Sequence, residues 1–299
     1  MAELYERFEH PELDSPVLIM FLEGWIDAGL GAANAASLLL DELDTTPIVS
    51  FDADQLLDHR ARRPVMHLVD GMNTGLTWPL IELRAGTDSA GNDILLLVGA
   101  EPDHAWRKFS SAVVDLALDL GTRMVVGLGA YPAAVPHTRP TKLASTSVDE
   151  SLVEKIGFVR GTIDVPAGVQ AAIERRCSEA GLSALGLWAQ VPHYAAAMPY
   201  PSASAALVDG LNDLAGLQLD ATKLREESEG TDIRLGRLVA ESPEHAELIH
   251  ELERHADMEA DERPTQGGGA DEPTQPDLEM QSGDELAAEL EQFLREQGD

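Results

Sequence analysis

Residues 17–29, Val-Leu-Ile-Met-Phe-Leu-Glu-Gly-Trp-Ile-Asp-Ala-Gly, contain a transition from strand to helix that indicates the fold class. The apolar run 17–22 has the length of a strand, and the chain then turns at Gly24 into an alanine-rich segment. An uninterrupted apolar strand that leads into a helix is typical of a parallel strand buried on both faces. Because open α/β folds bind ligands at the carboxyl ends of such strands, we expect a site beside the turn at 23–29.

The rest of the chain repeats this alternation of strand and helix. Further strand-like runs occupy residues 47–51, 65–69, 80–83, 94–98, 124–128 and 184–189, and helical periodicity occupies 30–43, 105–120, 168–180 and 204–217. The alternation predicts a three-layer α/β/α sandwich with a mostly parallel sheet. No helix separates 65–69, 80–83 and 94–98, so these runs are predicted to form an antiparallel part of the same sheet.

The composition divides the chain into four segments. We expect an α/β/α core domain over residues 1–220 and a charge-rich helical extension over 221–258. Residues 259–282 contain three consecutive glycines and almost no apolar side chains, which predicts a flexible acidic linker. Residues 283–299 are predicted to form an amphipathic helix.

The predicted C-terminal helix begins with a capping box at Ser282. One face presents Leu286, Leu290, Phe293 and Leu294 at helical spacing. An apolar face on a tethered helix is a common means of recruiting a partner, so we expect it to dock on a partner protein. Docking on the chain's own core is the alternative.

Charge and cysteine content exclude several kinds of partner and site. The formal net charge of −32 at pH 7 repels nucleic-acid phosphates and anionic lipid, so we expect neither as a partner. Cys177 is the only cysteine, which leaves no internal disulfide and no cysteine-based zinc site. The first 14 residues contain five acids and no apolar core, and prolines interrupt the uncharged stretch 180–208, so neither a signal peptide nor a membrane span is predicted. We therefore expect a cytoplasmic protein.

The familiar catalytic and cofactor motifs are missing from the sequence. His250 and His255 are five residues apart, which rotates their rings roughly 140° from each other on a helix, so a zinc site of the H-E-x-x-H type is not expected. Gly127 and Gly129 follow a strand, but the third glycine of a dinucleotide fingerprint is absent. No P-loop and no G-x-S-x-G elbow occurs. We therefore assign no catalytic residue, no metal ligand and no cofactor.

Polar clusters follow several of the predicted strands. Their candidate binding residues are Glu23, Trp25, Asp27, Arg62, Arg63, Glu101, His137, Arg139 and His193. Because the carboxyl ends of parallel strands meet at one rim, we expect a pocket in which arginines face carboxylates and a histidine can transfer protons. The alternative is structural, with arginine–carboxylate pairs that hold long loops together.

Five short motifs in order resemble a known family. They are Gly24-Trp25-Ile26-Asp27-Ala28-Gly29, the segment 58–64, Glu101-Pro102 with Trp106-Arg107, the segment 136–140, and Pro192-His193-Tyr194. The chain thereby resembles the bacterial branch of the proteasome assembly chaperone family, which is related to the second eukaryotic assembly chaperone. The resemblance covers roughly residues 15–255. It implies an α/β/α core related to phosphorylase/hydrolase-like folds, a tendency to homo-oligomerise, and no established catalytic residues.

Two functions remain open on this basis. The first is a non-catalytic assembly or interaction protein, whose partner the resemblance relates to the proteasome. The second is a small-molecule-binding protein or enzyme with a rim pocket like that of nucleoside phosphorylases, favoured because arginine recognises anions well. For self-association, the apolar segment 195–206 is expected to supply the contact patch.

Overall fold

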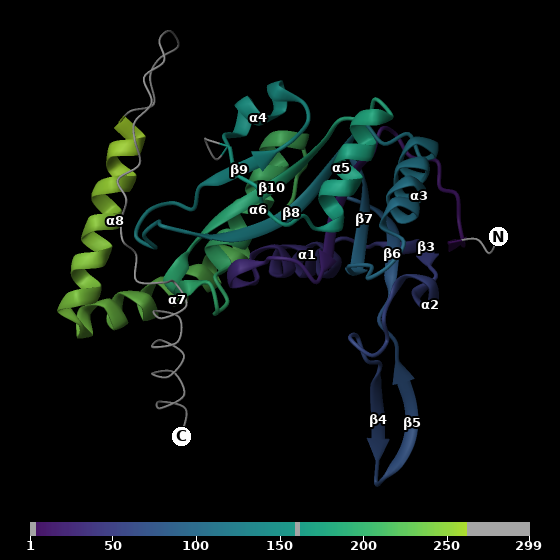
Figure 1. Ribbon diagram of the computed structural model, residues 1–299, viewed down its shortest axis with the longest axis horizontal. Coiled ribbons are helices and arrows are strands. Elements are labelled where there is room, and N and C mark those ends of the chain that lie inside the picture. Colours follow the sequence, from purple (N-terminus) through teal and green to yellow (C-terminus); the bar gives the residue numbers. More distant parts are fainter. Residues whose placement is uncertain (1–3, 159–161, 262–299) are drawn as a thin grey trace.

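The computed structural model describes residues 4–158 and 162–261, and an eight-stranded sheet forms its centre (Figure 1). The strand order is β1-β3-β6-β7-β2-β8-β10-β9. The strands are β1 (Tyr5–Arg7), β2 (Val17–Glu23), β3 (Thr46–Phe51), β6 (Ile81–Thr87), β7 (Asp93–Ala100), β8 (Met124–Ala133), β9 (Leu143–Thr146) and β10 (Ala184–Pro192).

Strand β2 lies in the interior of the sheet, as the sequence predicts. It pairs in parallel with β7 on one side and with β8 on the other, and β8 pairs in parallel with β10. Val17, Leu18, Ile19 and Met20 are buried because both faces of the sheet are covered. Antiparallel pairs flank this parallel centre, with β6, β3 and β1 beyond β7 and with β9 beyond β10.

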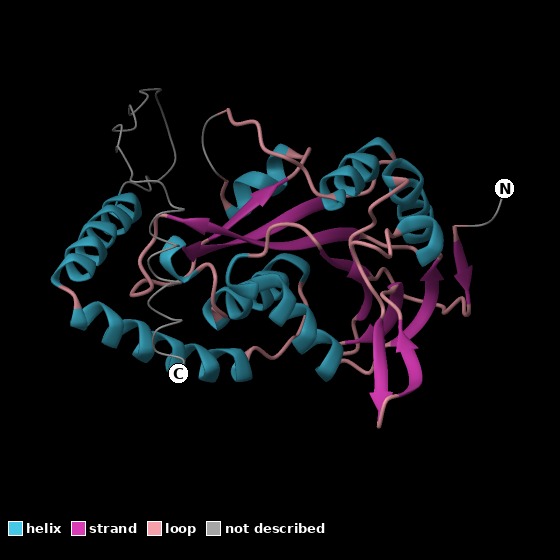
Figure 2. Ribbon diagram, turned by 60° about the horizontal axis from the view of Figure 1, so that its bottom comes forward, coloured by secondary structure: helices cyan, strands magenta, loops and turns pink. Residues whose placement is uncertain are grey.

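Two layers of helices cover the sheet (Figure 2). Helices α1 (Gly31–Glu42) and α6 (Pro201–Ala215) pack on one face, and α3 (Trp106–Asp119) and α5 (Val169–Glu179) pack on the other. The predicted three-layer α/β/α architecture with an antiparallel part is therefore confirmed. The short elements are α2 (Ala53–Leu56), α4 (Glu150–Ile156), η1 (Ala28–Leu30) and η2 (His193–Ala195).

Helix α1 begins directly against β8, and a glycine makes this possible. A Cβ atom at Gly31 would lie 2.8 Å from the Cβ of Ala130 and 3.1 Å from that of Ala203, closer than ordinary packing permits. A β-bridge between Asp27 and Ala130 joins the preceding loop to the same strand. The loop after β2 is thus fixed to the carboxyl end of β8.

The run 65–69 is a strand, but the prediction that it joins the main sheet is wrong. It forms β4 (Val65–Val69), which pairs only with β5 (Met72–Thr77) in a separate two-stranded sheet. Asp70 and Gly71 connect the two strands with φ values of 50° and 82°, as a type I′ turn requires. The resulting hairpin projects from the body (Figure 1).

The segment 195–206 is not the surface patch that the sequence suggests. Ala195, Tyr200 and Ala203 are buried in the core between the sheet and helices α1 and α6. Pro201 starts α6 at the first helical position, where its missing N–H costs nothing. The prolines of this segment therefore place a core helix instead of exposing an apolar loop.

Two further helices follow the core. Helix α7 (Thr222–Glu241) packs against α6, and α8 (Pro243–Asp261) returns over the loop that follows β8. Both are exposed on one side and bury a sparse apolar stripe, Leu224 and Leu235 in α7 and Leu252 in α8. The predicted helix over 283–299, and the linker beyond residue 261, lie outside the described residues. Among the residues that the structure describes, no helix is long and apolar enough to span a membrane.

Candidate functional site at the carboxyl edge of the sheet

Four parallel strands end at the same edge of the sheet, and candidate residues follow each of them. Glu23 ends β2, Glu101 follows β7, His137 lies beyond β8, and His193 follows β10. The parallel pairings β7-β2-β8-β10 place these ends side by side. Around them the polar side chains form two clusters, one at β2 and β7 and the other at β8 and β10.

Arg62 organises the first cluster by binding the backbone at the end of β2. Its Nη1 donates to the carbonyl oxygen of Glu23 at 3.1 Å, and its Nε donates to Oδ2 of Asp103 at 3.4 Å. The guanidinium occupies the space into which a Cβ of Gly24 would project, and Gly24 has a φ of 139°. A side chain at Gly24 would therefore displace Arg62 and strain the turn.

Glu101 fastens the start of α5 to the same edge. Its Oε1 accepts a hydrogen bond of 2.6 Å from the backbone N–H of Val169, and the side chain is only 7% exposed. A carboxylate at a helix N-terminus binds an otherwise unpaired N–H and interacts favourably with the helix dipole. Trp25 lies against this junction, because a Cβ at Gly168 would be 2.9 Å from its ring.

Asp27 performs the same role for α1. Its two carboxylate oxygens accept hydrogen bonds from the backbone N–H groups of Ala32 and Ala33, at 2.8 and 2.9 Å. Burial raises the pKa of Asp27, and the two backbone hydrogen bonds oppose this rise. The residue at the N-cap position itself, Leu30, has a left-handed φ of 52° and no capping side chain.

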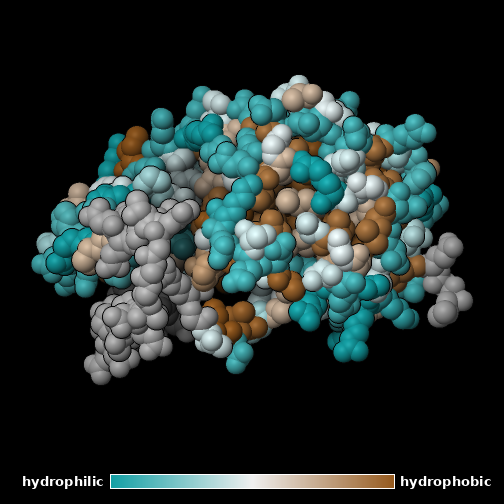
Figure 3. All heavy atoms as spheres, turned by 90° about the horizontal axis from the view of Figure 1, so that it is seen from above, coloured by the Kyte–Doolittle hydropathy of each residue, from teal (hydrophilic) through white to brown (hydrophobic). Residues whose placement is uncertain are grey.

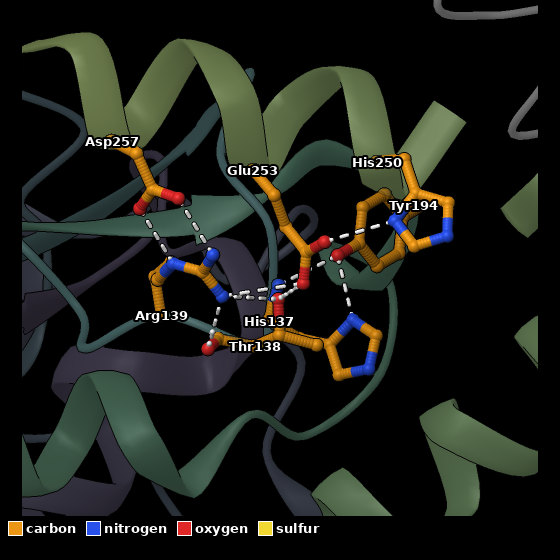
Figure 4. Close-up of polar contacts among 7 residues, drawn as sticks. All are labelled: His137, Thr138, Arg139, Tyr194, His250, Glu253 and Asp257. Atoms are coloured by element: carbon orange, nitrogen blue, oxygen red, sulfur yellow. Dashed lines mark hydrogen bonds and ion pairs between the residues drawn. The ribbon is translucent and has the colours of Figure 1, made fainter. Parts of the chain in front are cut away.

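His137 and Tyr194 form the buried part of the second cluster (Figure 4). The Tyr194 hydroxyl accepts a hydrogen bond from the backbone N–H of His137 at 2.8 Å and lies 2.9 Å from its Nδ1. Burial lowers the pKa of His137, while the carboxylates of Asp232 and Glu253 act in the opposite direction. The ring of His193 packs edge-on against Tyr194.

Arg139 joins the loop after β8 to helix α8 (Figure 4). Its Nε and Nη2 donate to the two carboxylate oxygens of Asp257, both at 2.8 Å, and its Nη1 donates to Oε1 of Glu253 at 3.2 Å. Thr138 donates to the same Glu253 oxygen at 2.6 Å. The guanidinium beside Asp257 holds the pKa of that carboxyl below its usual range.

The structure separates the predicted site residues into these two groups. Asp27 and Glu101 each bind the backbone at the start of a helix, whereas Arg62 and Arg139 pair with acids that sequence analysis did not select. Arg63 is exposed and makes no ion pair within residues 4–158 and 162–261. Sequence analysis did not select Asp103, Asp232, Glu253 or Asp257 as site residues, and it named Tyr194 only as part of a family motif.

Large apolar side chains are exposed at this edge beside the paired polar groups. Trp25 and Ile26 are each 42% exposed and Leu30 is 49% exposed, all in the loop after β2. In the described part of the chain, no three His, Cys, Asp or Glu side chains are arranged to hold a metal ion. The loop that carries these side chains is joined to the start of α1 by the two part-buried hydrogen bonds of Asp27.

Comparison with known proteins identifies the family. The sequence matches the PAC2 family over residues 21–239. A Corynebacterium glutamicum protein of unknown function is 32% identical, with 87% of this chain and 99% of that chain covered and a TM-score of 0.79. A Mycobacterium tuberculosis protein of unknown function is 37% identical, with coverages of 86% and 90% and a TM-score of 0.79.

A third similar structure has a more informative description. It is a Mycobacterium tuberculosis proteasome-assembly chaperone homologue that is 30% identical, with 78% of this chain and 99% of that chain covered and a TM-score of 0.72. No curated protein matches this chain. Because the family match spans more than half of the chain and these relatives align over most of it, the chain belongs to the PAC2 family.

Proposed function

We propose that this chain is a non-catalytic assembly protein of the cytoplasm that binds a proteasome-related protein through the loop after β2. The observation that carries the proposal is the exposure of Trp25, Ile26 and Leu30 on a loop whose Asp27 carboxylate is already hydrogen-bonded to the start of α1. Rigid aromatic and aliphatic side chains are the usual centres of protein interfaces. The name of the Mycobacterium tuberculosis relative supports a proteasome-related partner.

The backbone of Leu30 adds to this argument. A left-handed conformation costs a residue with a Cβ about 1–2 kcal/mol, and it persists only where the surroundings enforce it. Here the strained backbone conformation places a half-exposed leucine at the carboxyl edge of the sheet. Strain of this kind concentrates at binding sites, so it supports a docking role for the loop.

The proposal is tested by binding to purified proteasome core-particle subunits from the organism that encodes the chain. We expect the double variant Trp25→Ser/Ile26→Ser to bind at least about tenfold more weakly, because truncating central apolar residues typically costs 1–2 kcal/mol or more each. Ile233→Ser is the matched control, since Ile233 is 58% exposed on α7. Equal binding by wild type and the double variant would contradict the proposal, as would failure of the wild type to bind.

For self-association we propose the β4–β5 hairpin in place of the segment 195–206. Eight large apolar residues of 65–80 are at least 45% exposed, and Asp70 is the one charged residue among these sixteen. They can supply roughly the 800 Å² that each partner buries in a standard interface. Five paired residues extend about 17 Å, which is twice the Debye length of about 8 Å at physiological salt. Two strongly acidic copies can therefore meet through this hairpin with little repulsion between their bodies.

Light scattering tests the hairpin. We expect a homo-oligomer for the wild type, a monomer for Leu68→Asp/Val69→Asp, and an unchanged mass for Ile233→Asp. The hairpin substitutions do not touch the core, because β4 is exposed along its whole length. A monomeric wild type at tens of micromolar would contradict the proposal.

The C-terminal segment is proposed as a second contact with the partner. Its leucines Leu286, Leu290 and Leu294 and Phe293 form the predicted docking face. Leu290→Asp is expected to weaken partner binding and to leave the melting temperature of the core unchanged. A large loss of thermal stability would show instead that this segment packs on the core.

A small-molecule site is the second candidate function, and one observation favours it. Oδ1 of Asp232 is buried without a hydrogen-bond partner near His137, with which it interacts electrostatically. Buried polar atoms are normally paired, so an unpaired one is compatible with a ligand contact. Binding of inorganic phosphate or nucleosides, measured by calorimetry and lost in Asp232→Asn, would support this function; no detectable binding would reject it.

A further inference from the structure

An open groove of about 380 Å³ lies between the edge strand β1 and helix α3. Leu4, Tyr5 and Ala112 supply apolar surface, and Arg107, Lys108 and Asp115 supply charge. In Figure 1, α3 and the N-terminal strand lie at the same end of the molecule, with the hairpin below them and α8 at the opposite end. The groove is therefore separate from the polar cluster that holds α8.

The backbone of β1 has an unpaired side that faces away from the sheet. Strand β1 is the last strand on its side, paired only with β3. The backbone N–H of Phe8 donates to the carbonyl oxygen of Ile48, and the carbonyl oxygen of Leu4 accepts from the N–H of Asp52. The backbone N–H and C=O groups of the even-numbered residues of β1 therefore point towards β3. In an antiparallel pair, alternate residues direct their N–H and C=O groups the same way. The backbone groups of Tyr5 therefore point outward beside the groove, where another strand can pair with them.

The two basic residues of the groove, Arg107 and Lys108, occupy positions that are electrostatically unfavourable for a positive charge. Arg107 and Lys108 lie in the first turn of α3, whose helix dipole disfavours positive charge. Across the described residues, neither side chain has a hydrogen-bond or ion-pair partner. Although the chain carries 53 Asp and Glu against 21 Lys and Arg, these two are, like Arg63, among the basic residues without an ion pair in the described part of the chain. A local arrangement that lowers stability without compensation is characteristic of a functional site.

We propose that the groove binds an extended acidic segment of another protein, which adds to β1 as a further strand. Main-chain hydrogen bonds to Tyr5 would fix the strand, and alternate side chains would enter the groove. Carboxylates on that face would form charge-assisted hydrogen bonds with Arg107 and Lys108. Apolar side chains beside them would contact Leu4 and Ala112.

Charge decides between an acidic partner segment and a second copy of this chain. Pairing β1 with β1 of a second copy would bring Arg107, Lys108 and Asp115 from each copy to one interface, which leaves a net charge of +2 there. Like charges placed together oppose association. An acidic segment neutralises both cations, so a different protein is the occupant that the chemistry favours.

The test selects ligands for the groove from a displayed library of random peptides, using the full chain as bait. We expect the selected peptides to be acidic, with β-branched or aromatic residues at alternate positions. Their affinity should fall about tenfold or more for Arg107→Glu/Lys108→Glu, because two charge-assisted contacts become repulsive. Bound peptide should slow hydrogen exchange at the amides of Tyr5 and Arg7.

Two controls locate the effect in the groove. Lys223→Glu/Arg237→Glu makes the same change in net charge on exposed positions of α7 and should bind the peptides as the wild type does. Trp25→Ser should also leave peptide binding unchanged, which separates this surface from the loop after β2. The proposal is overturned if the library yields no acidic peptides, if the groove variant binds them as tightly as the wild type, or if exchange slows elsewhere than at β1.

Discussion

The guanidinium of Arg139 binds the carboxylate of Asp257 through two parallel hydrogen bonds, although 118 residues separate them in the sequence. With Glu253 as a second acceptor, this pair attaches α8 to the loop after β8. Lys142 and Glu259 form a further ion pair at 2.8 Å along the same helix. The helical extension is thus held to the core by basic residues of the core and acidic residues of α8.

These pairs predict that α8 loosens when charge is removed or screened. In Arg139→Gln, amide hydrogen exchange along α8 should accelerate, while exchange in the sheet stays unchanged. Raising salt from about 0.1 to 1 M should produce the same change in the wild type, because the Debye length falls from about 10 to 3 Å. Arg254→Gln, an exposed position on the same helix, is the control and should exchange as the wild type does.

Removing the buried acceptor at Glu101 should destabilise the start of α5. Glu101→Ala leaves the N–H of Val169 without its partner, and we expect the free energy of unfolding to fall by about 2 kcal/mol. Glu101→Gln retains an oxygen acceptor and should lose less. Denaturant titration of both variants measures the difference. Equal losses would mean that the negative charge, and not the acceptor, supplies the stabilisation.

The variant Leu30→Gly should be more stable than the variant Leu30→Ala, although glycine usually destabilises a protein relative to alanine. Leu30→Gly relieves the strain of the left-handed backbone, whereas Leu30→Ala keeps it. After the entropic cost of glycine is subtracted, we expect the free energy of unfolding to be about 1 kcal/mol higher for Leu30→Gly than for Leu30→Ala. Both variants remove the exposed leucine and should bind the partner more weakly. Thermal unfolding and partner binding test the two effects separately. An alanine variant as stable as the glycine variant would show that the backbone is unstrained.

The lowered pKa of His137 predicts how the free energy of unfolding depends on pH. Because burial holds its folded-state pKa below the ordinary value of about 6.5, the unfolded chain binds more protons than the folded chain between those two values. The free energy of unfolding should therefore fall as pH decreases from about 6.5 towards the folded-state pKa. Asp232, whose pKa is raised by burial, contributes the opposite slope at lower pH.

The variant His137→Asn tests this prediction, because asparagine retains an acceptor for Tyr194 and does not titrate. We expect its stability to vary less than that of the wild type between about pH 6.5 and 5. Urea titrations at several pH values provide the measurement. An identical slope in wild type and variant would assign the pH dependence to other groups.

Local sequence patterns predicted the elements best where a residue's environment follows from its neighbours. The run 17–22 is a buried interior strand, and helices 105–120 and 168–180 agree with α3 and α5 within one or two residues. The wrong assignment of 65–69 to the main sheet could have been avoided from the sequence, because Asp70-Gly71 between two apolar runs strongly predicts a β-hairpin. Short edge strands such as β1 and β9 carry too few residues to show a period.

The amino-acid sequence alone predicted the α/β/α class, the family and the edge of the sheet at which polar residues gather. It did so because hydrophobic period and strand direction are local properties of the chain. Contacts between distant parts of the folded chain were needed to show that Asp27 and Glu101 bind helix N-termini, that Arg139 binds α8, and that the hairpin leaves the sheet. Those outcomes depend on which distant groups come within hydrogen-bond distance, and no spacing along the chain encodes that distance.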